Sequence, residues 1–165
     1  MRRRLLTACC ALLLVFGVSA CGFQLQGQAG LPAVMDTTRL EIQDPYSPFA
    51  RRLLTLLEQN GVHVVTSGEA GAVLEVPVNE VRRDVLTIGD NARVREYRVW
   101  QRVEFRLVDA DGSVLLPTQR LQQSRVISFD ETDILASTRE EEFLRQDLAD
   151  VMSRTVLRRL SQAGD

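Results

Sequence analysis

A long alternation of apolar and polar residues, from Arg95 to Asp109, constrains the fold of this chain more than any other feature. A period of two is what a β-strand with one covered face requires, and the segment is far longer than an average strand. The sequence therefore predicts one long strand with two unlike faces. The apolar face contains Tyr97, Val99, Val103, Phe105 and Leu107, with Gln101 as the exception, and the opposite face contains Arg98, Trp100, Arg102, Glu104 and Arg106.

A second alternating segment begins at Ala72 and places Leu74, Val76 and Val78 on one face. Pro77 interrupts it. Because proline has no N–H for the hydrogen-bond ladder, we expect this strand to lie at an edge or to carry a bulge. The strand is expected to reach about residue 83, with residues 85–88 as a candidate continuation and a turn at 89–91. Shorter strands are expected at about 39–43, 62–65, 114–116 and 120–129.

The first predicted helix has clear end signals. Ser47 suits the N-cap, and Pro48 suits the first helical position, where its missing N–H costs nothing. Gly61, after Asn60, suits the left-handed position just beyond the end. Between them Phe49, Leu53, Leu56 and Leu57 recur with helical spacing and define one apolar face.

A second helix is expected to run from Thr138 to about Ser161. Thr138 and Glu141 have the spacing of a capping box, in which each side chain bonds the backbone N–H of the other. Acidic residues gather at its expected start and arginines at its end, an order that suits the helix dipole. The acidic residues are Glu140, Glu141 and Glu142, and the basic residues are Arg154, Arg158 and Arg159.

Two helices and several strands predict an α+β two-layer sandwich. The helices would pack on the apolar face of a roughly four-stranded, mostly antiparallel sheet and leave the arginine-rich face open. We assign residues 1–20 to an export signal, 21–38 to an N-terminal segment and 39–165 to a single α+β domain.

The first residues have the three parts of a secretory signal. Arg2 to Arg4 supply the positive start, Leu5 to Val18 is a mostly apolar run too short to span a membrane comfortably, and small residues precede Cys21. The sequence Val18-Ser19-Ala20-Cys21 is similar to the lipobox of bacterial lipoproteins. Cys21 is therefore the predicted lipidation site, carrying an N-acyl diacylglyceryl group. No other cofactor is expected.

The net charge of the chain argues against nucleic acid as a binding partner. The chain has 20 basic residues, all of them arginine, and 22 acidic residues. Removal of Arg2 to Arg4 leaves 17 arginines, so the mature chain would carry a net charge of −5. Such an acidic exported chain is a poor nucleic-acid binder. Gly22, in place of the aspartate that often retains lipoproteins in the inner membrane, indicates an outer-membrane anchor with the domain facing the periplasm.

No pattern of catalytic residues is present. His63 is the only histidine, and its apolar neighbours suggest a partly buried structural side chain rather than a general base. The acidic run at 130–133 matches no calcium loop and is interpreted as a solvated turn. We find no nucleophile elbow, phosphate loop or metal-ligand spacing, so no catalytic or metal site is assigned. The sequence does not predict an enzyme.

The segment Cys21-Gly22-Phe23-Gln24-Leu25-Gln26-Gly27 resembles the start of the LptE family of lipopolysaccharide-assembly lipoproteins. The resemblance extends to Leu31-Pro32, Pro48-Phe49, Asn60-Gly61-Val62 and Glu96-Tyr97, and so covers nearly all of the mature chain. Gln26 stands where arginine is common in the family. The resemblance implies two helices on a four-stranded sheet and a role as a plug within LptD, an outer-membrane β-barrel that inserts lipopolysaccharide into the outer leaflet. It implies no bond-making chemistry.

The resemblance also implies that the chain binds lipopolysaccharide. Two sets of residues are therefore candidates, one for lipopolysaccharide binding and one for contact with the barrel. Arginine pairs bidentately with phosphate, a group that lipopolysaccharide carries. The open strand face would contact the barrel, whose lumen is polar. The alternative is that both sets form a solvated surface with ordinary ion pairs. Lipopolysaccharide-binding candidates are Arg93, Arg95 and Arg125, with Arg82 and Arg83 as weaker additions; barrel-contact candidates are Arg98, Trp100, Arg102 and Arg106.

Other classes of exported, lipid-anchored protein are alternatives to this interpretation. An auxiliary lipoprotein of a lipid-transport ABC system would have similar α/β content but an inner-membrane partner or a phospholipid ligand. A periplasmic hydrolase lacks its nucleophile and base in this sequence, and no peptidoglycan-binding motif is present.

Overall fold

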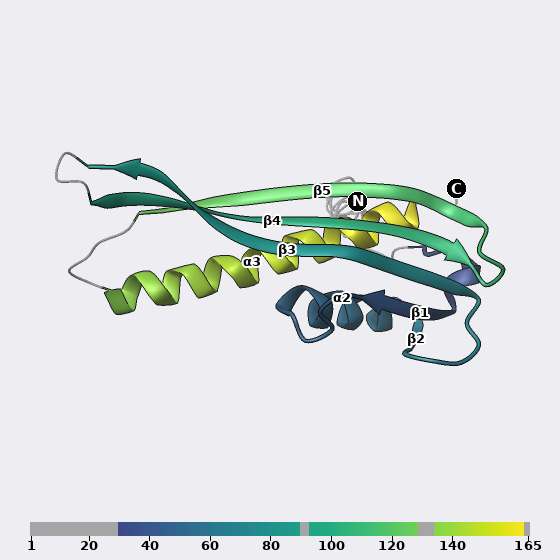
Figure 1. Cartoon of the computed structure of the whole chain (residues 1–165). Coiled ribbons are helices and arrows are strands. Elements are labelled where there is room, and N and C mark those ends of the chain that lie inside the picture. Colours follow the sequence, from purple (N-terminus) through teal and green to yellow (C-terminus); the bar gives the residue numbers. More distant parts are fainter. Residues whose placement is uncertain (1–29, 90–92, 129–133, 164–165) are drawn as a thin grey trace, which may run out of the picture.

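The long alternating segment forms an interior strand, next to one edge of the sheet. In the computed structural model, which describes residues 30–89, 93–128 and 134–163, it forms β4 (Val94–Asp109). Antiparallel neighbours flank it, β3 (Ala72–Ile88) on one side and β5 (Val114–Ser128) on the other. Sixteen residues of extended chain span about 50 Å, which makes the sheet long and narrow (Figure 1).

Two short strands complete the sheet, whose order is β2-β1-β3-β4-β5. β1 (Thr37–Ile42) runs parallel both to β3 and to β2 (His63–Val65). The long ladders are antiparallel, as expected. The sheet has five strands rather than about four because the short run after the first helix pairs with β1. The segments expected at 114–116 and 120–129 form one continuous strand.

Pro77 lies at a bulge in β3. The register passes from Glu75 opposite Arg106 to Val78 opposite Glu104, so β3 contains one extra residue there. β1 pairs with β3 only as far as Val76. This confirms the prediction from proline's missing N–H, because the ladder shifts register where the donor is lost.

The helix α2 (Pro48–Gln59) has the predicted ends. The Ser47 hydroxyl accepts a hydrogen bond from the N–H of Ala50 at 3.2 Å, and Pro48 is the first helical residue. Gly61 has φ of 87°, the left-handed conformation that ends the helix. The predicted apolar face, Phe49, Leu53, Leu56 and Leu57, is buried.

The helix α3 (Ile134–Ser161) begins four residues before Thr138, so the predicted start is wrong. Glu140 to Glu142 consequently lie beyond the first turn, which contains no acidic residue, and the expected interaction with the dipole at that end is lost. Arg158 and Arg159 do lie in the last turn. The helix buries Leu148, Met152, Val156 and Leu160 against the sheet and α2.

Both helices cover one face of the sheet and leave the other open (Figure 1). The core between the layers joins α2 and α3 to Leu74, Phe105 and Leu107. Met35, in the short 3₁₀ helix Ala33–Met35, is fully buried, so the folded part extends upstream of residue 39. The expected signal, Cys21, and the acidic run at 130–133 lie outside the described residues.

Candidate functional site

The open face of the sheet gathers the predicted barrel-contact residues. Arg98, Arg102 and Arg106 are exposed and alternate with the buried Val99, Gln101, Val103, Phe105 and Leu107. Because alternate residues of a strand point to opposite faces, the arginines lie on the side away from the helices. The predicted assignment of the two faces of β4 is therefore confirmed.

Cross-strand ion pairs neutralise most of this face. Arg106 Nε lies 2.7 Å from Glu75 Oε2, and Arg102 Nη2 lies 3.0 Å from Glu80 Oε2. The hydrogen bond from Arg106 to Glu75, with their charge attraction, raises the pKa of Arg106 above its ordinary value. On the other side of β4, Arg120 Nε lies 3.3 Å from Glu104 Oε1. The face is thus a ladder of alternating charges rather than a basic patch.

Trp100, on the same face of β4, contacts charged side chains of β3. Its indole Nε1 donates a hydrogen bond of 2.7 Å to Asp84 Oδ2, and the guanidinium of Arg82 lies 6.0 Å from the ring centroid. Arg82 also forms an ion pair with Glu80. Arg98 stands directly opposite Asp84 in the β3–β4 register, but Asp84 accepts from Trp100, and no side chain among the described residues forms an ion pair with Arg98.

The predicted lipopolysaccharide-binding residues do not come together as one cluster. Arg93 immediately precedes β4 and Arg95 is its second residue, and both are exposed. Arg125 pairs in register with Val99, about 13 Å along the strand from Arg95, and lies on the helix-covered side. Its guanidinium bonds Asp147 of α3 at 2.8 Å. Only Arg93 and Arg95 thus share one end of the hairpin.

Arg83, like Arg125, forms an ion pair with an acidic residue of α3. It faces α3, forms an ion pair of 2.8 Å with Glu141, and stacks 4.7 Å from the ring centroid of Tyr97. Glu141 also accepts from Arg145 at 2.8 Å. Burial raises the pKa of Glu141, but the hydrogen bonds and charges of Arg145 and Arg83 outweigh burial, and the pKa lies below its ordinary value. Sequence reasoning missed these acidic partners because they are distant in the chain.

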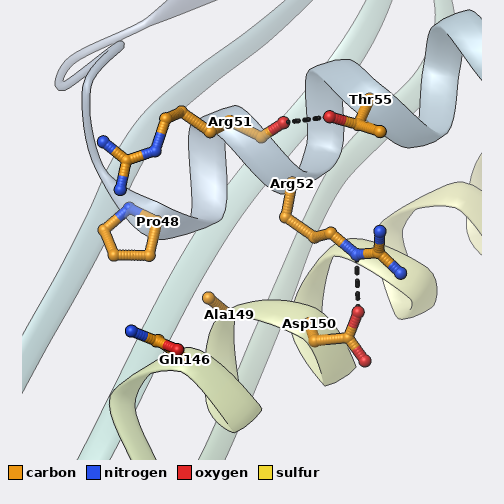
Figure 2. A pocket seen from close by; sticks show the side chains of 7 residues that line it. All are labelled: Pro48, Arg51, Arg52, Thr55, Gln146, Ala149 and Asp150. Carbon is orange, nitrogen blue, oxygen red and sulfur yellow. Dashed lines mark hydrogen bonds and ion pairs between the residues drawn. The ribbon is translucent and has the colours of Figure 1, made fainter. Parts of the chain in front are cut away.

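A groove of about 320 Å³ lies between α2 and α3, and Figure 2 shows its lining. Arg52 Nε donates to Asp150 Oδ1 at 2.6 Å across it, and Arg154 binds the other oxygen of Asp150 at 2.6 Å. The Arg51 guanidinium donates to the backbone carbonyl of Tyr46 at 2.8 Å, and no acidic side chain among the described residues pairs with it. No sequence pattern predicted this groove.

His63 and the acidic side chains were the remaining residues considered for catalysis or metal binding. His63 is exposed rather than partly buried as expected, because it opens the short edge strand β2. Within residues 30–89, 93–128 and 134–163, no three His, Cys, Asp or Glu side chains are grouped to hold a metal. In the same ranges no helix is long and apolar enough to cross a membrane.

The candidate site is thus the open, ion-paired face of a long twisted sheet in an α+β domain. Residues 35–160 match the family model described as LptE, lipopolysaccharide-assembly, and the chain belongs to this family. It is 28% identical to the LPS-assembly lipoprotein LptE of Photorhabdus laumondii, over 97% of this chain and 87% of that protein. The protein of the same name from Pectobacterium atrosepticum is 25% identical over 97% and 86%.

Solved structures of bacterial lipoproteins have the same fold. The solution structure of lipoprotein B from Nitrosomonas europaea matches with a TM-score of 0.71 and 26% identity, over 87% of this chain and 94% of that one. The minor lipoprotein of Acinetobacter baumannii matches with a TM-score of 0.66 and 23% identity, over 79% and 94%. The α+β class and the membership in a lipopolysaccharide-assembly family are therefore established, and this family agrees with a non-enzymatic role.

Proposed function

We propose that this chain is anchored to the outer membrane through lipid on Cys21, faces the periplasm, and plugs an LptD-type β-barrel that inserts lipopolysaccharide into the outer leaflet. The observation that carries the proposal is the ion-paired open face of the sheet. It supplies a long surface that is polar but nearly balanced in charge, formed by the pairs Arg102–Glu80, Arg106–Glu75 and Arg120–Glu104.

A plug needs such a surface for a physical reason. The interior wall of a large barrel is polar, so an apolar plug would leave the wall's polar groups without partners, and a strongly charged plug would be repelled by like charge. Cross-strand pairs hold the guanidinium groups of Arg102, Arg106 and Arg120 near carboxylates, so the face can exchange these pairs for groups on the wall. Trp100, half-buried among them, adds an aromatic contact of the kind enriched at interfaces.

The test is recovery of the barrel. The tagged chain is purified from outer membranes in mild detergent, and the co-purifying proteins are identified by mass. We expect a stoichiometric large β-barrel protein. The variant Trp100→Asp should reduce its recovery strongly, whereas Gln162→Asp, an exposed change beyond α3, should not. Recovery of an inner-membrane transporter in place of a barrel would instead indicate a lipid-transport accessory lipoprotein.

We further propose that Arg93 and Arg95 bind lipopolysaccharide phosphates at the end of the β3–β4 hairpin. Both side chains are exposed and two residues apart, and guanidinium groups match phosphate geometry. Arg125 is a weaker candidate because it lies on the helix-covered side, four residues along the strand register from Arg95, where it binds Asp147. The double variant R93Q/R95Q should weaken binding of purified lipopolysaccharide, while R139Q/R159Q, which removes two exposed arginines of α3, should bind as the wild type. Equal binding by both double variants would contradict this assignment.

A further inference from the structure

On the open face of the sheet, three arginines of β4 stand directly opposite an acidic residue of β3. The register pairs are Arg106 with Glu75, Arg102 with Glu80 and Arg98 with Asp84. In the first two pairs the guanidinium binds the opposing carboxylate, at 2.7 Å and 3.0 Å. In the third pair the carboxylate of Asp84 instead accepts a hydrogen bond from the indole Nε1 of Trp100, at 2.7 Å. Asp84 thus departs from the pairing pattern of this face.

The bond between Asp84 and Trp100 runs diagonally across the two strands. Trp100 lies opposite Arg82, and Asp84 lies two residues further along β3. Diagonal neighbours of an antiparallel pair are within reach of an aromatic side chain. The indole therefore extends from β4 toward β3, and its N–H takes the carboxylate that stands opposite Arg98.

Two contacts with β3 hold the indole. An indole has a single donor, its Nε1–H, and a bond from such a donor to a charged acceptor is roughly twice as strong as one between neutral groups. The guanidinium of Arg82 lies 6.0 Å from the ring centroid and forms an ion pair with Glu80. Because a tryptophan side chain has only two rotatable bonds, a bond at the edge of the ring and a cation over its face leave it little freedom.

An aromatic ring with a fixed orientation is suited to binding a partner. Binding energy concentrates on a few side chains, among which Trp is enriched, while the surrounding contacts contribute little and exclude water. Ordering a free side chain during association lowers the affinity, so a ring that is already ordered binds more tightly. Trp100 is half-buried within a face of ion pairs. Its orientation therefore affects how tightly a partner binds to this face.

We propose that Asp84 is a positioning residue for the barrel contact, because its carboxylate holds the indole of Trp100 in the orientation that meets the barrel wall. This inference rests on the function proposed above, which supplies the barrel. Asp84 acts through Trp100 and not through the wall. The role requires a hydrogen-bond acceptor rather than a negative charge, so Asp84→Asn should largely preserve it and Asp84→Ala should not.

The first measurement follows the ring itself. Trp100 is the only tryptophan, so the tryptophan fluorescence of the purified full chain in detergent micelles reports on this side chain alone. Time-resolved anisotropy separates tumbling of the whole particle from rotation of the ring on the picosecond-to-nanosecond scale. We expect little fast rotation in the wild type and in Asp84→Asn, and a clear fast component in Asp84→Ala. Glu69→Ala, which removes an exposed carboxylate from the loop before β3, should match the wild type.

The second measurement is competition for the barrel in cells. The wild type and one variant, carrying different tags and expressed equally, are produced together, and the recovered barrel is probed for both tags. The share of Asp84→Ala should fall roughly twofold to tenfold below that of the wild type, the range for ordering one side chain on binding. Asp84→Asn should keep most of its share, and Glu69→Ala should equal the wild type.

The two measurements separate the ways in which the proposals can fail. Absence of a barrel from the wild-type preparation would contradict the proposed function and this inference with it. Equal competition by Asp84→Ala in a barrel complex would leave that function standing and overturn the role of Asp84. An immobile ring in Asp84→Ala would overturn it as well, and so would equal losses in Asp84→Asn and Asp84→Ala, which would assign the effect to charge. Asp84 is exposed, so neither substitution opens the core, and far-UV circular dichroism checks that each variant is folded.

Discussion

Arg125 on β5 and Asp147 on α3 form an ion pair of 2.8 Å that joins the outer strand of the sheet to the C-terminal helix. A second pair, Arg83 with Glu141, does the same between β3 and α3, also at 2.8 Å. Arg83 and Arg125 flank Val99 of β4 in register, and their partners Glu141 and Asp147 both lie in the N-terminal half of α3. These two pairs therefore help to hold the N-terminal half of α3 against the long hairpin.

The variant Arg125→Gln should lower the free energy of unfolding by up to about 1 kcal/mol, the range for an exposed ion pair. Both side chains are about one-third exposed, so solvent screening keeps the effect small. Urea denaturation of this variant, of Asp147→Asn and of their double variant measures the coupling between the two residues. Arg139→Gln on α3 is the control. A fall in lipopolysaccharide binding with unchanged stability would instead return Arg125 to the ligand-binding set.

Stability should fall on acidification through Glu141. Its pKa in the folded chain is lowered, so it stabilises the fold above its unfolded pKa of about 4.3, and the contribution is lost as the pH falls through the lower folded value. We expect Glu141→Gln to be less stable than the wild type at pH 7 and to differ less from it at pH 3. Thermal unfolding at both pH values measures this. The same difference at both pH values would show that charge at Glu141 is not the cause.

Local signals explain which parts of the fold were predicted. Each confirmed prediction depends on residues close together in the sequence. They are the alternation in β4, the cap at Ser47 and the helix end at Gly61. The predicted start of α3 at Thr138 was wrong, because a capping-box spacing there does not exclude a helix that begins further upstream. The local pattern alone does not decide between these two starts.

Long-range partners explain the rest. Arg83 and Glu141 are 58 residues apart, and Asn79 lies 32 residues from Ser47 and 22 from Gln101. Their meeting depends on the strand register and on where the helices cross the sheet. For this reason the prediction of which face of β4 is exposed was correct. The prediction that Arg125 lies with Arg93 was wrong, because Arg125 faces α3.

The variant Ser47→Ala should cost about 1–2 kcal/mol of stability, because one hydroxyl serves two purposes. It accepts from the Ala50 N–H as the cap of α2 and also accepts from Asn79. Ser47→Asp keeps an acceptor at both contacts and should lose less. Ser124→Ala, an exposed serine of β5, is the control. Chemical denaturation ranks the three; equal stability of Ser47→Ala and the control would mean that the cap contributes nothing.

The variant Gly71→Ala should destabilise the fold by roughly 1–3 kcal/mol, the usual cost of forcing an extra group into a packed site. A Cβ at Gly71 would lie 2.5 Å from the backbone oxygen of Val34, a contact that no side-chain rotation relieves. Gly71 also donates its N–H to Thr37 at 2.9 Å and accepts from Ala110 at 3.2 Å, so moving it disturbs the starts of β1 and β3. Gly30→Ala is the matched control, since nothing lies within 4 Å of its added carbon. Urea unfolding of both variants should show a loss only for Gly71→Ala, and a comparable loss for Gly30→Ala would attribute the effect to the chain backbone rather than to the clash with Val34.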